Sequence, residues 1–305
     1  MENDLLAKLS GGLEPRSASF IVTVYGDVVV PRGGVLWTGS LIEICARVGI
    51  SESLVRTAVS RLVAAHRLRG ERAGRRSYYR LDASARQEFD EAAALLYAPD
   101  LPARGWQILH APCLTWDQAR ALRLGRMGGQ VFIRPDRGQE APLGAVLFHA
   151  SDPVEIAEVA QYWDLSALQS RYLDMLRRFG GIERIVGRVS DETALILRLL
   201  LVEDFRHALL RDPLLPPQVL PPDWKGTAAR DLFRRLYGAL TPAAERYIAA
   251  RLEGVDGFLP ARTAQSDGLL IGIFRNINPM ERPEAWVETS QKYKDFSLSV
   301  TLSAL

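Results

Sequence analysis

The clearest pattern of hydrophobic and polar positions lies between Ser40 and Leu81. Apolar residues recur there at helical spacing in two short stretches, which Gly49 separates. The first predicted helix buries Leu41, Ile44, Cys45 and Val48, and the second buries Leu54, Val55, Ala58, Val59, Leu62 and Val63. We expect a capping box over Ser40–Glu43, a left-handed cap at Gly49 and an N-cap at Ser51.

The opposite face of the second helix is polar. Ser53, Arg56, Thr57 and Ser60 recur there at i, i+3, i+4 and i+7, where an ordinary solvated face more often mixes Glu and Lys. Arginine can bond O6 and N7 of guanine, and Ser or Thr can reach bases or phosphates in a major groove. We therefore predict that this helix reads DNA. The expected contacts come from Ser51, Ser53, Arg56, Thr57, Ser60 and Arg61.

A basic hairpin is predicted directly after these helices. Two short stretches, Arg67–Arg72 and Arg75–Leu81, flank Ala73-Gly74, which fits a tight turn. The hairpin gathers Arg67, Arg69, Arg72, Arg75, Arg76 and Arg80, with Tyr78 and Tyr79 among them. Two helices followed by such a ribbon are typical of a winged helix-turn-helix. Further candidates for DNA contact are therefore Arg69, Arg72, Arg75, Arg76 and Tyr78. The alternative is a helical hairpin with an incidental basic ribbon that contacts protein or membrane.

The flanking residues complete an N-terminal domain. Arg16–Tyr25 is expected to form a helix that ends near Gly26, because it precedes the helix-turn-helix pattern, although its β-branched residues also fit a strand. Val35–Trp37 is expected to pair with the hairpin as a short strand, and Ala83–Leu96 to form a helix. Residues 1–15 are mixed and polar, and we expect a frayed tail.

The next segment alternates strands and helices. Trp106–His110, Gln130–Arg134 and Ala145–His149 are predicted strands. Thr115–Gln118 fits a capping box for a helix to Leu124, and Ser151-Asp152-Pro153 begins another helix with proline in its first turn. A strand, a helix, two strands and a helix match a ferredoxin-like α+β module.

The remaining chain is predicted to be mainly helical. Helices are expected over Ser166–Phe179, Asp191–Leu210, Gly226–Gly238 and Pro242–Glu253, and the five prolines from Asp212 to Asp223 predict an extended connection. Strand character appears later at Leu269–Phe274 and Leu298–Leu302. The predicted fold class is α+β and multidomain. Its parts are a flexible tail (1–15), a winged helix-turn-helix (16–98), a ferredoxin-like domain for dimerisation (103–180), a mainly α-helical effector-response domain (181–254) and a tail of open role (255–305).

A series of short motifs resembles the PaaX family of bacterial transcriptional repressors. The series is GDVVVPRGG, W-x-G-S-L, LVRTAVSRLV and GRRSYYRL, followed by Tyr162-Trp163-Asp164-Leu165 with Tyr172, Asp212-Pro213 through Leu220-Pro221, and Trp224-Lys225-Gly226. The resemblance covers about residues 17–252 and is specific as a series. It implies a repressor that an aryl-CoA thioester releases from DNA, phenylacetyl-CoA for the family's namesake. It also implies a central module similar to the small ferredoxin-like nuclease subunit of CRISPR adaptation.

That similarity raises an enzymatic alternative, which the residues do not favour. Such a nuclease needs carboxylates that hold Mg²⁺, but the first strand, WQILHAPC, ends without one, and Asp117 lies beyond it on the helix. We therefore expect the module to be structural or dimer-forming. The main alternative is a metal-dependent nuclease or a CoA-thioester-using enzyme with a basic N-terminal domain. The second alternative is a regulator that answers another ligand or none.

The implied CoA ligand would need cations for its phosphates and apolar or aromatic walls for its acyl group. Arginines on the helical segments supply the first and nearby aromatic residues the second. The candidates are Tyr162, Trp163, Arg171, Tyr172, Arg177, Arg178 and Arg206. Each has an ordinary explanation as well, because helical arginines are usually solvated and aromatic residues at helical spacing are usually core.

The distribution of charge supports the DNA-binding interpretation. Ten Arg and three Glu lie from Arg32 to Arg80, whereas the 305-residue chain has a net charge of only +2. Such a local basic patch is the electrostatic footprint of a nucleic-acid surface. The two Cys and four His have no disulfide or metal spacing. No P-loop, Gly-rich dinucleotide motif or Ser-His-Asp order appears either, so we predict no catalytic residue, metal or cofactor.

These patterns together predict a cytoplasmic bacterial protein. No apolar run approaches the roughly 20 residues of a membrane span, and no membrane partner is expected. We expect a homodimer on double-stranded DNA, with a roughly palindromic operator that mirrors its two-fold symmetry. A bound effector would change the spacing or orientation of the two DNA-binding heads. It can shift the equilibrium toward the released state only by as much as it binds that state more tightly than the DNA-bound state.

Overall fold

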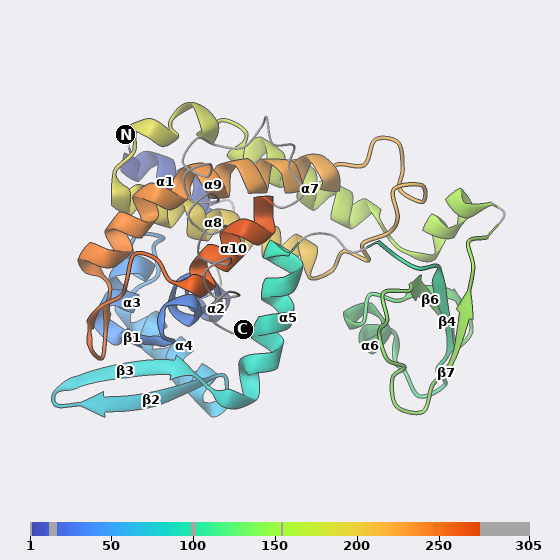
Figure 1. The fold of residues 1–305 in the computed structure, drawn as a ribbon, viewed down its shortest axis with the longest axis horizontal. Coiled ribbons are helices and arrows are strands. Elements are labelled where there is room, and N and C mark those ends of the chain that lie inside the picture. The colour runs from blue at the N-terminus through green and yellow to red at the C-terminus, as the bar shows by residue number, and fades with distance from the viewer. Residues whose placement is uncertain (1, 12–16, 99–101, 154, 275–305) are drawn as a thin grey trace, which may run out of the picture. The chain divides into compact units, whose positions relative to one another are not determined.

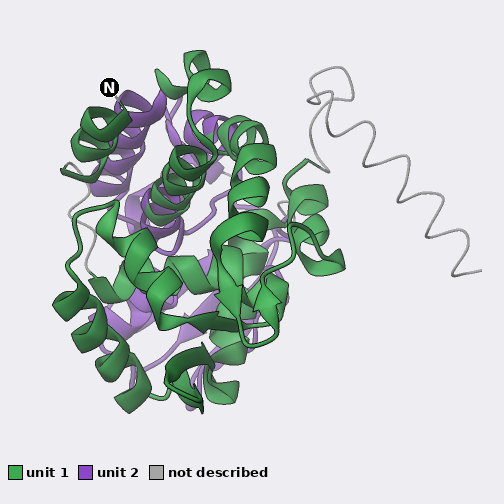
Figure 2. Cartoon of the chain, turned by 90° about the vertical axis from the view of Figure 1, so that its left-hand side faces the viewer, with its two compact units in different colours: residues 1–99, 181–203, 233–305 green, residues 100–180, 204–232 purple. Residues whose placement is uncertain are grey.

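The computed structural model describes residues 2–11, 17–98, 102–153 and 155–274. It is a mixed α+β structure of helices and small antiparallel sheets, so the predicted α+β class is confirmed (Figure 1). The chain divides into two compact units: unit 1 contains residues 1–99, 181–203 and 233–305, and unit 2 contains residues 100–180 and 204–232 (Figure 2). The five divisions expected from the sequence stay a prediction.

Unit 1 begins with the N-terminal helices and a three-stranded sheet. Its elements are α1 (Glu2–Gly11), α2 (Ser17–Val24), the π-helix η1 (Tyr25–Val29), η2 (Val30–Arg32), β1 (Val35–Trp37), α3 (Thr38–Ala46), α4 (Glu52–Ala64), β2 (Leu68–Ala73), β3 (Arg76–Leu81), η3 (Ala83–Ala85) and α5 (Arg86–Tyr97). The sheet order is β1-β3-β2, and both pairings are antiparallel. The predicted pairing of Val35–Trp37 with the hairpin is therefore confirmed.

Several local expectations for this region are wrong. Glu2–Gly11 is a helix rather than a frayed tail, because Leu6 and Leu9 are buried against the rest of the unit. The helix over Ser17–Val24 does not end at Gly26 but continues through η1 and η2. The capping box at Ser40 is absent, since α3 begins at Thr38 and the buried Ser40 hydroxyl instead accepts from the Glu253 N–H at 3.1 Å.

The C-terminal part of unit 1 is helical. The elements that complete it are α8 (Asp191–Leu209), α9 (Gly226–Arg251), β8 (Glu253–Gly254), β9 (Gly257–Phe258) and α10 (Ala264–Phe274), and α8 and α9 each have residues in both units. The expected strand at Leu269–Phe274 is wrong, because this short apolar run, whose type the pattern alone leaves ambiguous, lies inside α10. Residues 298–302 lie outside the described part.

The predicted break before Pro242 is also wrong, because α9 runs through it. Proline in a helix interior removes one hydrogen bond and costs about 3 kcal/mol or more. Burial of Leu240, Ala244 and Ile248 around it opposes that cost. The Thr241 hydroxyl also donates to the Tyr237 carbonyl at 2.7 Å, which keeps the preceding turn bonded.

A buried ion pair joins the N-terminal helices of unit 1 to α8. Asp27 in η1 and Arg198 in α8 lie 2.9 Å apart (Oδ2 to Nη2), and their side chains are 0% and 1% exposed. The hydroxyls of Tyr97 and Tyr237 donate to Asp27 Oδ1 at 3.0 and 2.7 Å. Because burial of a charge is costly unless it is paired and hydrogen-bonded, this cluster fixes how η1, α5, α8 and α9 pack.

Unit 2 is built on a four-stranded antiparallel sheet. Its elements are β4 (Trp106–His110), α6 (Trp116–Ala121), β5 (Gly125–Gly128), β6 (Val131–Pro135), β7 (Val146–Ala150), η4 (Ile156–Tyr162) and α7 (Ser166–Phe179). The strand order is β5-β6-β4-β7. One face of the sheet packs with α6 through Leu109, Ala119, Leu124 and Phe132. The other face packs through Trp106 and Ile133 with Val159 and the segment at Leu215–Val219.

The three strands predicted for unit 2 correspond to β4, β6 and β7, but the helix expected to run to Leu124 ends at Ala121. The capping box at Thr115 and Gln118 is present and α7 has the predicted bounds. Strand β5 was not predicted. No helix begins at Ser151–Pro153, because the Asp152 carboxylate accepts from Trp106 Nε1 at 3.0 Å and helical structure starts only with η4. The residues from Asp212 to Asp223 form no helix or strand, as their prolines predict.

Candidate nucleic-acid interface

Helix α4 places the predicted polar residues on its exposed side. Val55, Ala58, Val59 and Leu62 are buried, as the helical spacing predicts. The Ser51 hydroxyl caps the helix by accepting from the Leu54 N–H at 3.4 Å, and Gly49 has the predicted left-handed conformation (φ 81°). All six predicted residues of this helix are exposed, namely Ser51, Ser53, Arg56, Thr57, Ser60 and Arg61. Leu54 was predicted to be buried but is 53% exposed, so that prediction is wrong.

The basic hairpin is formed by β2 and β3. Its register pairs Ala73 with Arg76, so the turn is Gly74-Arg75 rather than Ala73-Gly74. Gly74 has a φ of 60°, a left-handed conformation that glycine adopts without strain. The arginines of the hairpin are exposed along both strands, whereas its base is anchored by the buried Leu36 and Leu68.

The structure separates the arginines of this surface into two groups. Arg56 pairs with Glu52 at 2.7 Å, Arg67 with Glu88 at 3.0 Å, Arg80 with Glu71, and Arg76 with Glu253. In the described part of the chain, Arg61, Arg69, Arg72 and Arg75 have no carboxylate within ion-pair distance. These four guanidinium groups are therefore the positive charges that the surface leaves unneutralised. Exposed ion pairs contribute little to stability, so Arg56, Arg67 and Arg80 can exchange partners at small cost. Arg76 differs, because its partner Glu253 is half-buried and the Trp37 ring also lies against its guanidinium.

Tyr78 does not fit its predicted role. Its side chain is only 6% exposed and lies opposite Trp37 in the sheet. It therefore belongs to the packed centre of the hairpin. The spacing of residues near Tyr78 could not show its burial, because α3 and α4 separate its pairing strand β1 from the hairpin in the sequence.

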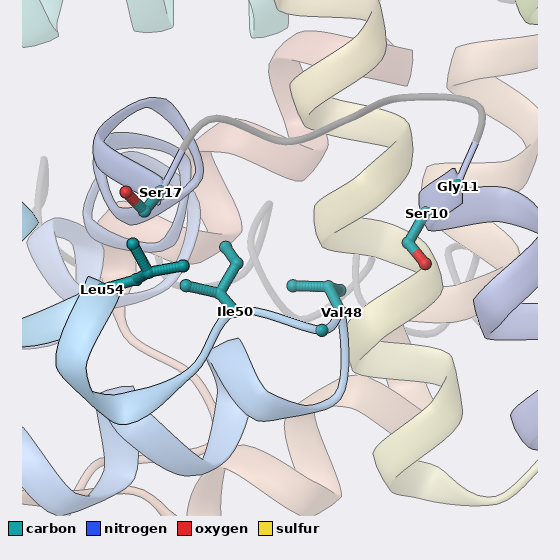
Figure 3. A pocket seen from close by; sticks show the side chains of 7 residues that line it. Ser10, Gly11, Ser17, Val48, Ile50 and Leu54 are labelled. Atoms are coloured by element: carbon teal, nitrogen blue, oxygen red, sulfur yellow. The ribbon is translucent and has the colours of Figure 1, made fainter.

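An open cleft lies beside the start of α4. It has a volume of about 440 Å³ and is lined by Ser10, Gly11, Ser17, Val48, Gly49, Ile50 and Leu54. Figure 3 shows Leu54, Ile50 and Val48 along one side of it, with Ser10 and Ser17 across from them. None of the predicted effector residues lines this cleft.

The predicted effector residues lie in unit 2, where their aromatic members are packed. Tyr172 is buried, its hydroxyl donates to Asp212 Oδ2 at 2.6 Å, and the Trp224 ring lies edge-on at 5.6 Å. Burial raises the pKa of Asp212, although the hydrogen bonds that its carboxylate accepts from the Tyr172 hydroxyl and the Leu214 N–H oppose the rise. Trp163 donates its Nε1–H to the Arg123 carbonyl, and with Tyr162 it packs on the core around Trp106. The aromatic residues thus belong to two packing clusters rather than to one ligand wall.

The predicted effector arginines lie on α7 and α8. Arg171 and Arg177 are exposed on α7, and Arg177 pairs with Asp174 at 3.2 Å. Arg178 pairs with Asp204, and Arg206 is half-buried on α8. None of these contacts tests the predicted effector pocket, which stays a prediction.

The described residues contain no candidate metal site and no candidate membrane span. No group of three or more His, Cys, Asp or Glu side chains that could hold a metal ion occurs among them. None of their helices is both long and apolar enough to cross a membrane.

Comparison with known proteins identifies the family. The family model described as PaaX-like protein matches residues 16–85, and the model described as PaaX-like protein C-terminal domain matches residues 163–250. The transcriptional repressor PaaX of Escherichia coli (strain K12) is 28% identical over 272 residues, which cover 80% of this chain and 86% of the relative. A solved structure, the uncharacterized protein Rv0674 from Mycobacterium tuberculosis, is 22% identical with a TM-score of 0.44, and the match covers 67% of this chain and 88% of that chain. The chain belongs to the PaaX family.

Proposed function

We propose that the chain is a sequence-specific DNA-binding transcriptional regulator that represses a catabolic operon. The observation that carries the proposal is the exposed face of α4, where hydroxyl and guanidinium groups stand beside a hairpin with three unneutralised arginines. The name of the Escherichia coli relative, a transcriptional repressor, supports the same role. Binding rather than catalysis is the proposed activity, and a cytoplasmic location in a bacterial cell follows from it.

In this proposal, residues 16–98 act as a winged helix-turn-helix. Helix α3, the turn at Gly49 and α4 supply the helix pair, and the β2–β3 hairpin is the wing. Helix α4 enters a major groove, where Arg56 and its neighbouring hydroxyls contact base edges. The arginines without a carboxylate partner, Arg61, Arg69, Arg72 and Arg75, neutralise phosphates, which positions the helix without reading sequence. Tyr78 has no place in this interface because it is buried.

We further propose that unit 2 is a ferredoxin-like module that forms a homodimer. The order β5-β6-β4-β7 and the helix α6 between β4 and β5 support this assignment. The sheet face opposite α6 is only partly covered. On its open part, Val146 and Phe148 of β7 are 53% and 56% exposed. Exposed apolar patches mark interaction sites, and a two-fold homodimer would bury this patch against its own copy.

The proposed effector is an aryl-CoA thioester such as phenylacetyl-CoA. The family resemblance supports it, and the arrangement of side chains adds little. The exposed Arg171 and Arg177 of α7 remain candidates for the CoA phosphates. Tyr172 would have to leave the packed core to contact an acyl group, so we assign it to structure instead.

The proposal is tested by selection of duplexes from a random-sequence DNA pool with the purified full chain. Enrichment of one roughly palindromic sequence is expected, because a dimer places two α4 helices on two half-sites. Fluorescence anisotropy should then show binding that weakens steeply as salt is raised. Recovery of no sequence above the starting pool, with no salt-dependent binding, would overturn the proposal. Addition of phenylacetyl-CoA to the complex then tests the effector separately.

A further inference from the structure

The segment after α9 makes an ion pair with the basic hairpin. The Arg76 guanidinium in β3 pairs with the Glu253 carboxylate in β8. The same guanidinium lies 4.5 Å from the centre of the Trp37 ring in β1. A carboxylate and an aromatic face both attract a guanidinium. The Tyr78 hydroxyl also accepts a hydrogen bond from this group, so Arg76 has three side-chain neighbours.

Glu253 reaches Arg76 from a fixed backbone. Its N–H donates to the Ser40 hydroxyl of α3 at 3.1 Å. A Cβ on the adjacent Gly254 would lie 3.3 Å from the Val35 carbonyl oxygen, so β8 passes close to β1. The Leu259 N–H donates to the Leu252 carbonyl at 2.7 Å and closes the short β8–β9 hairpin. Figure 1 shows this hairpin after α9, beside β1 and the basic hairpin.

The origin of Glu253 distinguishes this ion pair from its neighbours. Arg56, Arg67 and Arg80 pair with Glu52, Glu88 and Glu71, which all come from the same N-terminal region. Arg76 receives its partner from β8, which directly follows α9, a helix that begins in unit 2 and ends in unit 1. A displacement of that helix end that also breaks the Glu253–Ser40 bond would separate Glu253 from Arg76 and leave the other pairs in place.

We propose that the Arg76–Glu253 pair is an autoinhibitory contact, by which the segment after α9 withholds one guanidinium from DNA phosphate. The inference rests on the proposed DNA-binding function and adds a means of regulating it. Carboxylate and phosphate oxygens compete for the same donors. While the pair is intact, the hairpin presents Arg69, Arg72 and Arg75 to the backbone. When the pair opens, Arg76 adds a phosphate contact and releases a further counterion.

The test is the salt dependence of binding to a random-sequence duplex, measured by anisotropy with the full chain. Glu253→Gln keeps the shape of the side chain and the backbone bond to Ser40 but weakens the hold on Arg76. It should make the slope of log Kobs against log salt more negative by about 0.9. Equivalently, the ratio of the variant's affinity to the wild-type affinity should be roughly 3.5-fold higher at about 50 mM salt than at about 200 mM. Arg76→Gln alone should leave the wild-type slope unchanged.

Two controls separate this contact from a general charge effect. Asp256→Asn removes an exposed acid from the tip of the same β8–β9 hairpin and should leave the slope at its wild-type value. The double variant Glu253→Gln/Arg76→Gln should return to the wild-type slope, because the freed guanidinium is gone. Thermal unfolding of each variant confirms that the chain is folded.

Three results would overturn the proposal. The first is a less negative slope in Arg76→Gln than in the wild type, which would show that wild-type Arg76 already contacts phosphate. The second is a slope in Glu253→Gln that equals the wild-type slope. The third is a slope in Asp256→Asn that becomes more negative by as much as in Glu253→Gln. Failure of the wild type to bind any duplex would instead contradict the proposed function itself, so the two failures are distinguishable.

Discussion

Replacement of Arg198 by methionine should destabilise unit 1 strongly. Methionine fills much of the same volume, but it leaves the Asp27 carboxylate buried at 0% exposure without the guanidinium 2.9 Å away. Removing one partner of a buried ion pair typically costs about 3–5 kcal/mol. The two tyrosine hydroxyls at 2.7 and 3.0 Å remain and hold the cost within that range. Since domains unfold at a cost of about 5–15 kcal/mol, Arg198→Met should remove a large fraction of the stability.

The assay is native-state hydrogen exchange of the α2 amides and of the α8 amides over residues 191–203, all of which belong to unit 1. It reports opening of unit 1 separately from unit 2. Urea unfolding of the full chain provides a second estimate. The matched control is the double variant Asp27→Asn/Arg198→Met, in which neither buried charge remains. Its loss in free energy of unfolding should be smaller than the summed losses of Asp27→Asn and Arg198→Met by at least about 2 kcal/mol. A cost below about 1 kcal/mol for Arg198→Met would refute the reasoning, since it lies well under the range for a broken buried pair.

Four other predictions follow from the same structure. Arg56→Ala should reduce discrimination between the selected operator and its base-substituted variants by about 1–3 kcal/mol, and unchanged discrimination in anisotropy titrations would contradict the placement of α4. Arg75→Ala should weaken binding to all duplexes alike and make the salt slope less negative by about 0.9, whereas no change would remove Arg75 from the phosphate contacts. Phe148→Glu should convert the homodimer to a monomer in sedimentation velocity, and a persistent dimer would place the interface elsewhere. Hydrogen bonds from the Gly138 N–H and His149 lower the pKa of Asp136, so the stability that its carboxylate contributes is present above the unfolded pKa of about 3.9 and is lost as pH falls through the lower folded pKa. Asp136→Asn should therefore destabilise the chain at neutral pH and have little effect in acid. An equal loss of stability at both pH values in urea unfolding would contradict the assignment.

Local signals in the sequence predicted the candidate interface well. The cap at Ser51, the left-handed Gly49 and the spacing of the apolar residues of α4 all act within one or two helical turns, and each is present. The same holds for the capping box at Thr115. Such contacts depend on neighbours in the chain, so a single sequence contains the information that specifies them.

Apart from the pairing of β1 with β3, several features set by distant contacts were missed. Glu253 was predicted to end a helix, and nothing near it in sequence indicates a partner in β3. The continuity of α9 through Pro242 depends on burial of the helix on both sides of the proline. One signal could have predicted the buried ion pair: Arg198 stands alone inside the apolar run Ala194–Val202. An arginine in such a run is buried only with a partner, although the sequence does not reveal that the partner is Asp27.

The most direct test of the account compares affinities for the selected operator and for a scrambled duplex of the same length. Wild-type protein should bind the operator at least about 10³-fold more tightly, as specific regulators do. The triple variant Arg56→Ala/Thr57→Ala/Ser60→Ala should lose most of that ratio while its affinity for the scrambled duplex stays close to the wild-type value, because the phosphate contacts of Arg61 and the hairpin remain. A triple variant that keeps the full ratio would show that α4 does not read the sequence and would contradict the central claim.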